Sequence, residues 1–268
     1  MLKARIITSL VAAAVISSAI FMLSLEGYAL LFGVVAVVAG YEWGSLLILS
    51  HRSRGVIGAI IMAVIMFSSW AAREWFPFYL IMVFGILSWF LAAAIVWFYP
   101  QRKGFIQQPL ISSILGILII WSAWVTLLMV RIELPDVGVY WVFWILLLVA
   151  SADIGAFFTG RRFGARSLAP LVSPGKTWEG VFGGLLVACA VCGGILSFLG
   201  YSPTWWLYVA TLSVISVVGD LFESVLKRER GVKDSGNLLP GHGGILDRID
   251  GVLSVLPFFG SLILLGKF

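Results

Sequence analysis

The chain has 268 residues, of which 61% are hydrophobic and 12% charged, and its mean hydropathy is +1.06. Soluble domains hold roughly 45–50% apolar and about 25% charged residues, so a single soluble domain is excluded. A disordered protein and a secreted disulfide scaffold are excluded as well, because apolar residues dominate and only two cysteines occur. The apolar runs are long and unbroken, which favours membrane helices over the alternating segments of a β-barrel.

Nine apolar stretches approach the length of about 20 residues that a helix needs to cross the hydrocarbon core. They are residues 6–25, 28–50, 55–72, 76–99, 109–130, 137–158, 180–200, 204–226 and 245–266. The first is expected to be an uncleaved span and not a signal peptide, because it is long and the second follows almost at once. The sequence therefore predicts an all-α polytopic integral membrane protein with about nine transmembrane helices.

The distribution of basic residues predicts the orientation of these spans. With the N-terminus in the cytoplasm, 14 of the 18 Lys and Arg residues fall in cytoplasmic segments and three fall outside. Cytoplasmic loops of membrane proteins carry such an excess, so we expect a cytoplasmic N-terminus, an external C-terminus and a place in the inner (plasma) membrane. The formal net charge of +5 is then explained by topology and lipid contact, without a nucleic-acid partner.

Two parts of the chain are expected to differ in role. Residues 1–136 hold the first five predicted helices, and residues 137–268 form a catalytic membrane region with helices six to nine. Two polar cytoplasmic loops, residues 159–179 and 227–244, belong to the second part. Cys189 and Cys192 lie in a purely apolar run, so we interpret them as small lipid-phase residues without redox or zinc chemistry.

Acidic residues inside predicted spans are costly and therefore mark functional sites. Six occur, all nearer the predicted cytoplasmic end of their span: Glu42, Asp153, Asp220, Glu223, Asp247 and Asp250. A transporter usually places its site near the midplane, so this one-sided placement favours a cavity open to the cytoplasm. A plainer alternative is that the acids form structural ion pairs with Arg228 or Arg248.

The eighth predicted span has one polar face. Its polar residues are spaced three and four apart, as neighbours on a helix surface are: Ser213, Ser216, Asp220, Glu223 and Lys227. The ninth span repeats the arrangement with Asp247, Asp250 and Ser254. We therefore expect the two helices to contribute acids to one site.

The loop between these two helices has the character of a phosphate site. Its cations suit phosphate, and its glycines let backbone N–H groups approach an anion closely. Gly243 and Gly244 lead directly into the last helix, whose N-terminus is partly positive. Carboxylates alone would repel a phosphate, so their combination with these groups indicates a nucleotide site with a divalent cation, and hard oxygen ligands suit Mg²⁺.

The other cytoplasmic loop holds a sequence that is close to a P-loop. Gly175-Lys176-Thr177 would need a glycine at position 170, where Pro170 stands, and the preceding strand is missing. We reject the P-loop and keep Lys176 as a phosphate contact. Thr177 is expected to cap the seventh helix, and for Thr177 capping alone is an equally good interpretation.

These segments resemble a known signature. Ser224-Val225-Leu226-Lys227-Arg228, then Lys233-Asp234, then His242-Gly243-Gly244-Ile245-Leu246-Asp247-Arg248-Ile249-Asp250 resemble the signature of the phosphatidate cytidylyltransferases, also called CDP-diacylglycerol synthases. Supporting matches are Asp153-Ile154-Gly155-Ala156-Phe157 with Gly160-Arg161, the segment from Ser173 to Gly180, and the weaker Glu42-Trp43. The specific matches cover about residues 150–251.

The resemblance implies an activity and its cofactors. The reaction is the formation of CDP-diacylglycerol and pyrophosphate from CTP and phosphatidic acid, a step of phospholipid biosynthesis. The resemblance also implies Mg²⁺ near carboxylates of the last two helices and suggests a second, monovalent cation such as K⁺. By it, Asp220 and Asp247 match the metal-site acids of the family.

Combining residue chemistry with the resemblance, we assign roles as follows. The catalytic set is Asp220, Asp247, Lys227, Asp250 and His242, with metal ligands drawn from Asp220, Asp247, Glu223 and Asp250. Substrate binding is assigned to Lys176, Arg228, Lys233, Asp234, Gly243, Gly244, Arg248, Asp153 and Arg161. His242 is either a general acid for the leaving group or a phosphate or loop contact.

Two other functions remain open at this point. A CTP-dependent kinase of a polyprenol-type lipid would need a similar CTP site, but with a hydroxyl nucleophile, a general base and attack on the γ-phosphorus. A transporter of an anionic substrate should show repeated halves and midplane charges, which we do not find in the sequence. The expected partners are CTP, phosphatidic acid and the lipid bilayer, and the sequence leaves room for a homodimer.

Overall fold

The computed structural model describes residues 14–47, 52–75, 77–99, 101, 103–238 and 243–266. Residues 14–22 are helical. The long helices are α2 (Leu25–Ser45), α3 (Arg52–Ala71), α4 (Phe78–Phe98), α5 (Pro109–Glu133), α6 (Gly138–Phe163), α7 (Trp178–Ala188), α9 (Trp205–Arg230) and α10 (Leu246–Leu264). The shorter elements are η1 (Phe105–Gln107), β1 (Ser167–Ala169), β2 (Ser173–Thr177), the π-helical η2 (Cys189–Gly193) and α8 (Gly194–Phe198).

Seven helices in the described part of the chain are long and apolar enough to cross a membrane. They correspond to the second to eighth predicted spans, with α7, η2 and α8 joined into one. The ninth predicted span is α10, whose first five residues include Asp247, Arg248 and Asp250. Most of the first predicted span lies outside the described residues. The protein is thus a multi-pass α-helical membrane protein, while the count of nine and the orientation of the termini stay predictions.

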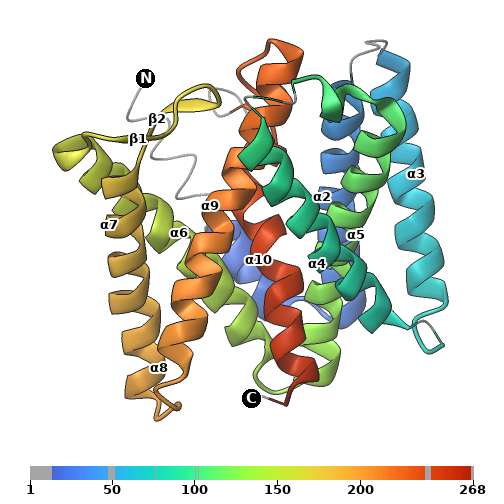
Figure 1. Ribbon diagram of the computed structural model, residues 1–268. Helices are drawn as coiled ribbons and strands as arrows, with labels where there is room; N and C mark the ends of the chain where they lie inside the picture. Colours follow the sequence, from blue (N-terminus) through green and yellow to red (C-terminus); the bar gives the residue numbers. More distant parts are fainter. Residues whose placement is uncertain are drawn as a thin grey trace.

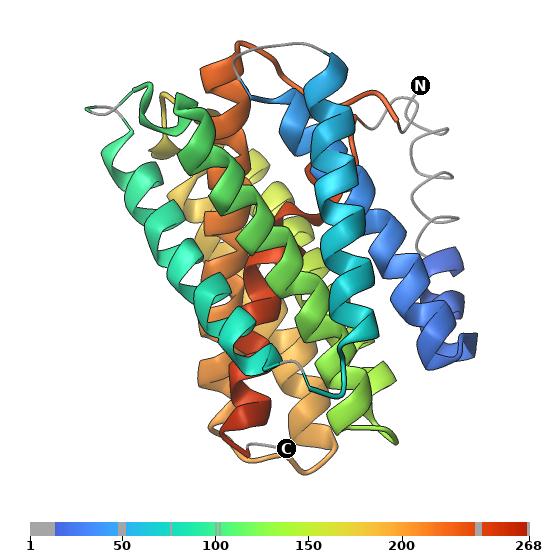
Figure 2. The ribbon, with the colours of Figure 1, turned by 90° about the vertical axis from the view of Figure 1, so that its right-hand side faces the viewer.

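Helix α10 lies in the interior of the bundle. It packs against α9, α5, α4 and α6, and its first residues also approach α2. Figures 1 and 2 show that α10 begins near mid-height and runs to the lower end, whereas α9 continues to the upper end. The charged first turn of α10 therefore lies at about mid-height in the bundle, beside α9.

Small residues bring several helix backbones into direct contact. A Cβ added to Gly184 on α7 would lie 2.5 Å from the Ala152 carbonyl oxygen of α6. One added to Gly219 on α9 would lie 2.4 Å from the Asp250 carbonyl oxygen of α10. Such close approach is typical of helix pairs in membranes, where dispersion forces replace the hydrophobic effect between helices.

We expect Gly219→Ala to destabilise the protein by about 1–3 kcal/mol, because the new methyl group must push α9 away from the α10 backbone. Gly194→Ala is the matched control, since nothing lies within 4 Å of its added Cβ. The measurement is the free energy of unfolding in detergent for both variants. Equal stability of the two variants would contradict the close α9–α10 contact.

A small hairpin is the one departure from helix that the sequence did not predict in the described segments. Strands β1 and β2 pair antiparallel, with Ser167 opposite Thr177 and Ala169 opposite Ser173. The Thr177 hydroxyl accepts the Gly180 N–H at 3.1 Å, so the predicted cap of the seventh helix is confirmed. The Glu179 carboxylate accepts the Ala165 and Arg166 N–H groups at 3.1 and 3.2 Å and holds the hairpin at the start of α7.

Candidate functional site

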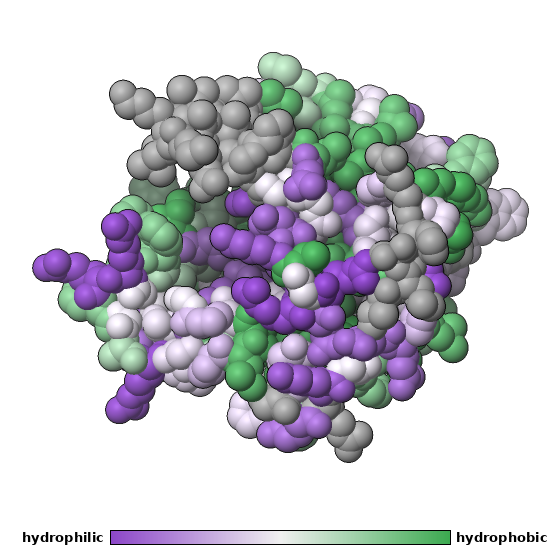
Figure 3. Space-filling model, turned by 90° about the horizontal axis from the view of Figure 1, so that it is seen from above, coloured by the Kyte–Doolittle hydropathy of each residue, from purple (hydrophilic) through white to green (hydrophobic). Residues whose placement is uncertain are grey.

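The polar face of α9 meets the first turn of α10 beside the hairpin. Seen from above, hydrophilic residues gather over the middle of the upper face of the molecule (Figure 3). Asp220, Glu223 and Lys227 follow one another on α9 at intervals of three and four residues, as the sequence predicted for one helix face. The structure brings them together with Asp247 and Lys176 through the ion pairs described next.

Lys227 links the two helices electrostatically. Its ammonium group forms an ion pair with the Glu223 carboxylate, and its Nζ lies 2.6 Å from Asp247 Oδ1. The three side chains are 14%, 6% and 7% exposed, so little water screens these charges. Removing one partner from such a group leaves an uncompensated buried charge. The three side chains therefore depend on one another for their stability.

The loop before α10 fixes the Asp247 carboxylate. Its Oδ2 accepts hydrogen bonds from Ser235 N–H at 2.9 Å, from the Ser235 hydroxyl at 2.9 Å and from Gly244 N–H at 2.8 Å. Gly243 has φ +82°, and a Cβ there would lie 2.6 Å from Asp247 Oδ2. Glycine is required at this position for its left-handed backbone and for the close approach of the carboxylate.

A cavity of about 270 Å³ opens between α6, α7 and α9 beside this cluster. Its polar lining includes Asp153, Asp220 and Lys176, and the Lys176 ammonium pairs with the Asp220 carboxylate. Its other walls are largely apolar and include Phe157, Val181, Leu185, Val214 and Val217. The cavity thus has charged residues, Asp153, Lys176 and Asp220, on one part of its wall and apolar residues on the rest.

Carboxylates outnumber cations in the connected cluster. Charge interactions link Asp153 to Asp220, both of them to Asp250, and Asp250 to Glu223. Together with Asp247 these are five acids, facing two lysines, Lys176 and Lys227. Glu223 Oε1 is buried and has no hydrogen-bond partner among the described residues. Such a surplus of hard oxygen donors fits an added cation.

No three His, Cys, Asp or Glu side chains in the described ranges are arranged as a finished metal site. Three of the acids form ion pairs with lysines: Asp220 pairs with Lys176, and Glu223 and Asp247 pair with Lys227. The lysines therefore sit between the acids that we assigned to the metal.

The end of α9 is tied to two neighbouring loops. Arg228 Nε donates to the Val172 carbonyl oxygen at 2.9 Å, which links α9 to the hairpin. The Glu229 carboxylate accepts the Gly104 N–H at 3.1 Å. Burial, together with the nearby Glu229 charge, raises the pKa of Tyr99. One N–H donor of Arg228 thus binds the protein backbone, and its other N–H groups are the ones that could contact a phosphate.

The remaining predicted residues are placed around this centre. Arg161 is exposed in the last turn of α6, and Lys233 and Asp234 are exposed in the loop after α9. Arg248 lies in the first turn of α10. Asp250 Oδ1 accepts the Gly251 N–H at 2.8 Å. His242 lies outside the described residues.

The structure adds two residues to those that received a role from the sequence. Glu42 on α2 is 2% exposed and accepts the N–H groups of Ile245 at 2.9 Å and Leu246 at 2.8 Å. The Ser235 hydroxyl lies within hydrogen-bond distance of both the Glu42 and the Asp247 carboxylates. Its place as an acid in an apolar span marks Glu42 as a functional candidate, but the sequence does not show what it contacts. Nothing in the sequence distinguishes Ser235 from other loop serines.

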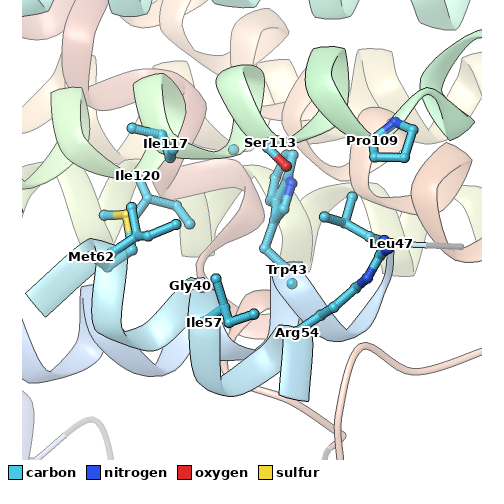
Figure 4. Close-up of a pocket in the computed structure, with 14 residues that line it drawn as sticks. Gly40, Trp43, Leu47, Arg54, Ile57, Met62, Pro109, Ser113, Ile117 and Ile120 are labelled. Atoms are coloured by element: carbon cyan, nitrogen blue, oxygen red, sulfur yellow. The ribbon is translucent and has the colours of Figure 1, made fainter. Parts of the chain in front are cut away.

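A second cavity, of about 260 Å³, lies between α2, α3 and α5 (Figure 4). Its walls are mainly apolar, and Arg54 is the charged residue among its lining side chains. Figure 4 shows the Trp43 ring extending from α2 toward Ser113 on α5. The carboxylates of the cluster are absent from this lining, so the cavity is separate from the acid–lysine site.

Comparisons with known proteins agree along nearly the whole chain. The sequence model of the Cytidylyltransferase family matches residues 3–265. A protein named phosphatidate cytidylyltransferase from Pseudomonas aeruginosa is 37% identical over 275 residues, which cover 98% of this chain and 97% of that protein. One of the same name from Haemophilus influenzae is 34% identical over 281 residues and 97% of each chain. Another, from Bacillus subtilis, is 44% identical over 137 residues, 50% of this chain and 51% of that protein.

Proposed function

Because the chain belongs to the cytidylyltransferase family and is a nucleotidyltransferase, we propose that it transfers the cytidylyl group of CTP to phosphatidic acid. The products are CDP-diacylglycerol and pyrophosphate. The observation that best supports this proposal is the pairing of Lys176 with Asp220 and of Lys227 with Asp247 and Glu223, beside a cavity with apolar walls. Cations for phosphates, acids for a metal and apolar walls for acyl chains then lie next to one another.

In the proposed reaction a phosphate oxygen of the lipid attacks the α-phosphorus of CTP in line. The bond from the α-phosphorus to the α,β-bridging oxygen breaks, and pyrophosphate leaves with the electron pair. Phosphoryl transfer depends on positioning and charge neutralisation, so no covalent enzyme intermediate is expected. Lys176 and Lys227 bind phosphate oxygens in the loaded site, with Arg228, Lys233 and Arg248 as further phosphate contacts.

Mg²⁺ fits the surplus of carboxylates in this cluster. We propose that Asp220 and Asp247 hold it, and that Glu223 and Asp250 serve as outer or second-cation ligands, with K⁺ as the second cation. When bound, Mg²⁺ neutralises charge on the α- and β-phosphates of CTP. The chain's own contribution is to orient the acids, as Lys227, Ser235 and Gly244 do for Asp247.

The proposed membrane arrangement follows the charge distribution. With the N-terminus in the cytoplasm and nine spans, the upper face of Figure 1 is cytoplasmic, and CTP approaches from that side. The cavity between α6, α7 and α9 is the proposed place of the lipid phosphate, with Phe157 and Val214 among the side chains beside its acyl chains. Asp234, Gly243, Gly244, Arg161 and Asp153 shape the rim of this site, and His242 contacts a phosphate or the loop.

One assay tests the proposed function. Purified protein is supplied with labelled CTP, phosphatidic acid and Mg²⁺, and the products are separated. We expect a CDP-lipid and pyrophosphate. Release of CDP with a phosphorylated polyprenol would favour the kinase alternative, and the absence of any lipid product would contradict both enzyme functions.

We expect the transfer to invert the configuration at the α-phosphorus. A single in-line displacement inverts the attacked centre, whereas a covalent enzyme intermediate would require two displacements and would retain it. The measurement uses one diastereomer of CTP with sulfur on the α-phosphorus and determines the configuration of the CDP-lipid formed. Retention would contradict the direct attack by the lipid phosphate.

A further inference from the structure

We propose that Glu42 is a positioning residue of the active site: its carboxylate holds the first turn of α10 and thereby orients the Asp247 carboxylate. The positioning role adds to the proposed cytidylyl transfer. It depends on that function only for the activity measurement. Glu42 lies on α2, 203 residues before Ile245, to which it is hydrogen-bonded. Its hydrogen bonds go to Ser235, Ile245 and Leu246, to none of which we have assigned direct contact with substrate.

The contacts of Glu42 account for a fully buried carboxylate. Oε1 accepts the Ile245 N–H at 2.9 Å, and Oε2 accepts the Leu246 N–H at 2.8 Å and lies 3.2 Å from the Ser235 hydroxyl. No ion pair joins Glu42 to a Lys or Arg within the described ranges. Its charge is instead balanced by the free N–H groups and the positive end of α10, through charge-assisted hydrogen bonds.

The loop is shaped around this carboxylate. A Cβ on Gly244 would lie 2.5 Å from Glu42 Oε2, and one on Gly236 would lie 2.6 Å from Oε1. Real Cβ atoms essentially never lie this close to another heavy atom. Glycine at these two positions therefore lets the backbone pack directly against the Glu42 carboxylate. The glycine-rich loop that sequence reasoning assigned to phosphate therefore also encloses a protein carboxylate.

The adjacent residue fixes the rotation of α2. Trp43 Nε1 donates to the Ser112 carbonyl oxygen of α5 at 2.9 Å. Its ring lies against Gly116, where a Cβ would be 2.3 Å from Nε1. Consecutive helix residues point about 100° apart, so anchoring Trp43 on α5 turns Glu42 toward α10. The Trp43 contact therefore explains why the Glu42 side chain faces the loop before α10.

Glu42 and Asp247 share the same turn of backbone. The Gly244 N–H donates to Asp247, and the next two N–H groups, of Ile245 and Leu246, donate to Glu42. The Ser235 hydroxyl lies between the two carboxylates, 2.9 Å from Asp247 Oδ2 and 3.2 Å from Glu42 Oε2. Loosening this turn at Glu42 therefore also loosens the backbone donor that holds Asp247.

Glu42→Gln is the variant that tests the proposal. The amide keeps the size of the side chain but has a single acceptor oxygen, and its NH₂ group faces a backbone donor. Partners that orient metal ligands typically contribute about 10–100-fold to metal affinity or activity. We expect kcat to fall by about that factor with little change in KM for phosphatidic acid. Glu26→Gln is the matched control, because Glu26 is exposed at the start of the same helix.

Two measurements that need no turnover accompany the kinetics. Hydrogen–deuterium exchange of peptides from residues 243–250 should be faster in Glu42→Gln than in the wild type and unchanged in Glu26→Gln. Binding of Mn²⁺, followed by the electron paramagnetic resonance signal of the free ion, should weaken by about tenfold or more. If Glu42→Gln does not fold, Ser235→Ala removes the hydroxyl next to both carboxylates and should move all three measurements in the same direction.

The outcomes separate this proposal from the proposed function. Normal kcat with unchanged exchange in residues 243–250 would overturn the positioning role, even if the melting temperature fell. Faster exchange and weaker Mn²⁺ binding in a protein whose wild type makes no CDP-lipid would support the positioning role and overturn the proposed reaction. Conservative Glu42→Asp should recover part of the kcat lost in Glu42→Gln, because it restores two acceptor oxygens.

Discussion

Replacing Asp247 by Asn is expected to abolish cytidylyl transfer while leaving the protein folded in the membrane. The remaining amide oxygen can still accept the Ser235 and Gly244 N–H groups, and Lys227 keeps Glu223 as its partner. The charge offered to a metal is lost, however. Metal stabilisation is worth several kcal/mol, which at 1.36 kcal/mol per factor of ten corresponds to a loss of about 10³-fold or more.

The measurement is the rate of CDP-lipid formation at saturating CTP and phosphatidic acid, with folding checked by gel filtration and circular dichroism in detergent. Asp136→Asn is the matched control, because Asp136 is an exposed acid in the connection between α5 and α6. It should leave the rate unchanged. Near-normal turnover of Asp247→Asn would contradict the assignment of Asp247 to the metal.

Replacing Lys227 by Met is expected to have the largest effect on stability. The Glu223 and Asp247 side chains, 6% and 7% exposed, would lose the cation that both of them contact. Breaking a buried ion pair on one side typically costs about 3–5 kcal/mol, because a buried charge is left uncompensated. We therefore expect the free energy of unfolding to fall by about that amount and activity to be lost.

A second substitution tests the physical cause. Glu223→Gln on the Lys227→Met background removes one of the two stranded charges, so the double variant should be more stable than Lys227→Met alone. Lys103→Met, at an exposed position, is the control and should change the free energy of unfolding by no more than about 0.5 kcal/mol. A double variant that is less stable than Lys227→Met would contradict the stranded-charge explanation.

Local patterns predicted much of this architecture. The spacing of Asp220, Glu223 and Lys227 predicts that they share one helix face, and the lengths of the apolar stretches predict the seven membrane-capable helices of the described residues. Thr177 was identified as a helix cap because capping depends on residues three positions apart. These features depend on neighbours in the chain, which a sequence displays directly.

Contacts between distant segments could not be predicted in this way. The strands of the β1–β2 hairpin are too short to show an alternating pattern. The hairpin is held by hydrogen bonds between the residues just before β1 and the start of α7, where the Glu179 carboxylate accepts and the Trp178 N–H donates. The pairing of Lys176 with Asp220 and of Lys227 with Asp247 depends on where the side chains end in space. The contact of Glu42 with α10 joins residues 204 positions apart.

That long-range contact has a consequence for biosynthesis. Residue 42 leaves the ribosome long before residue 245, so α2 is synthesised before the N–H donors of Ile245 and Leu246, which bind Glu42, exist. In hydrocarbon an unpaired carboxylate is costly, and the newly made N-terminal helices therefore carry a polar defect that only the last helix removes. An interrupted chain would keep this defect and would also lack Asp247, the acid that we propose as a metal ligand, so an incomplete product would have no complete metal site.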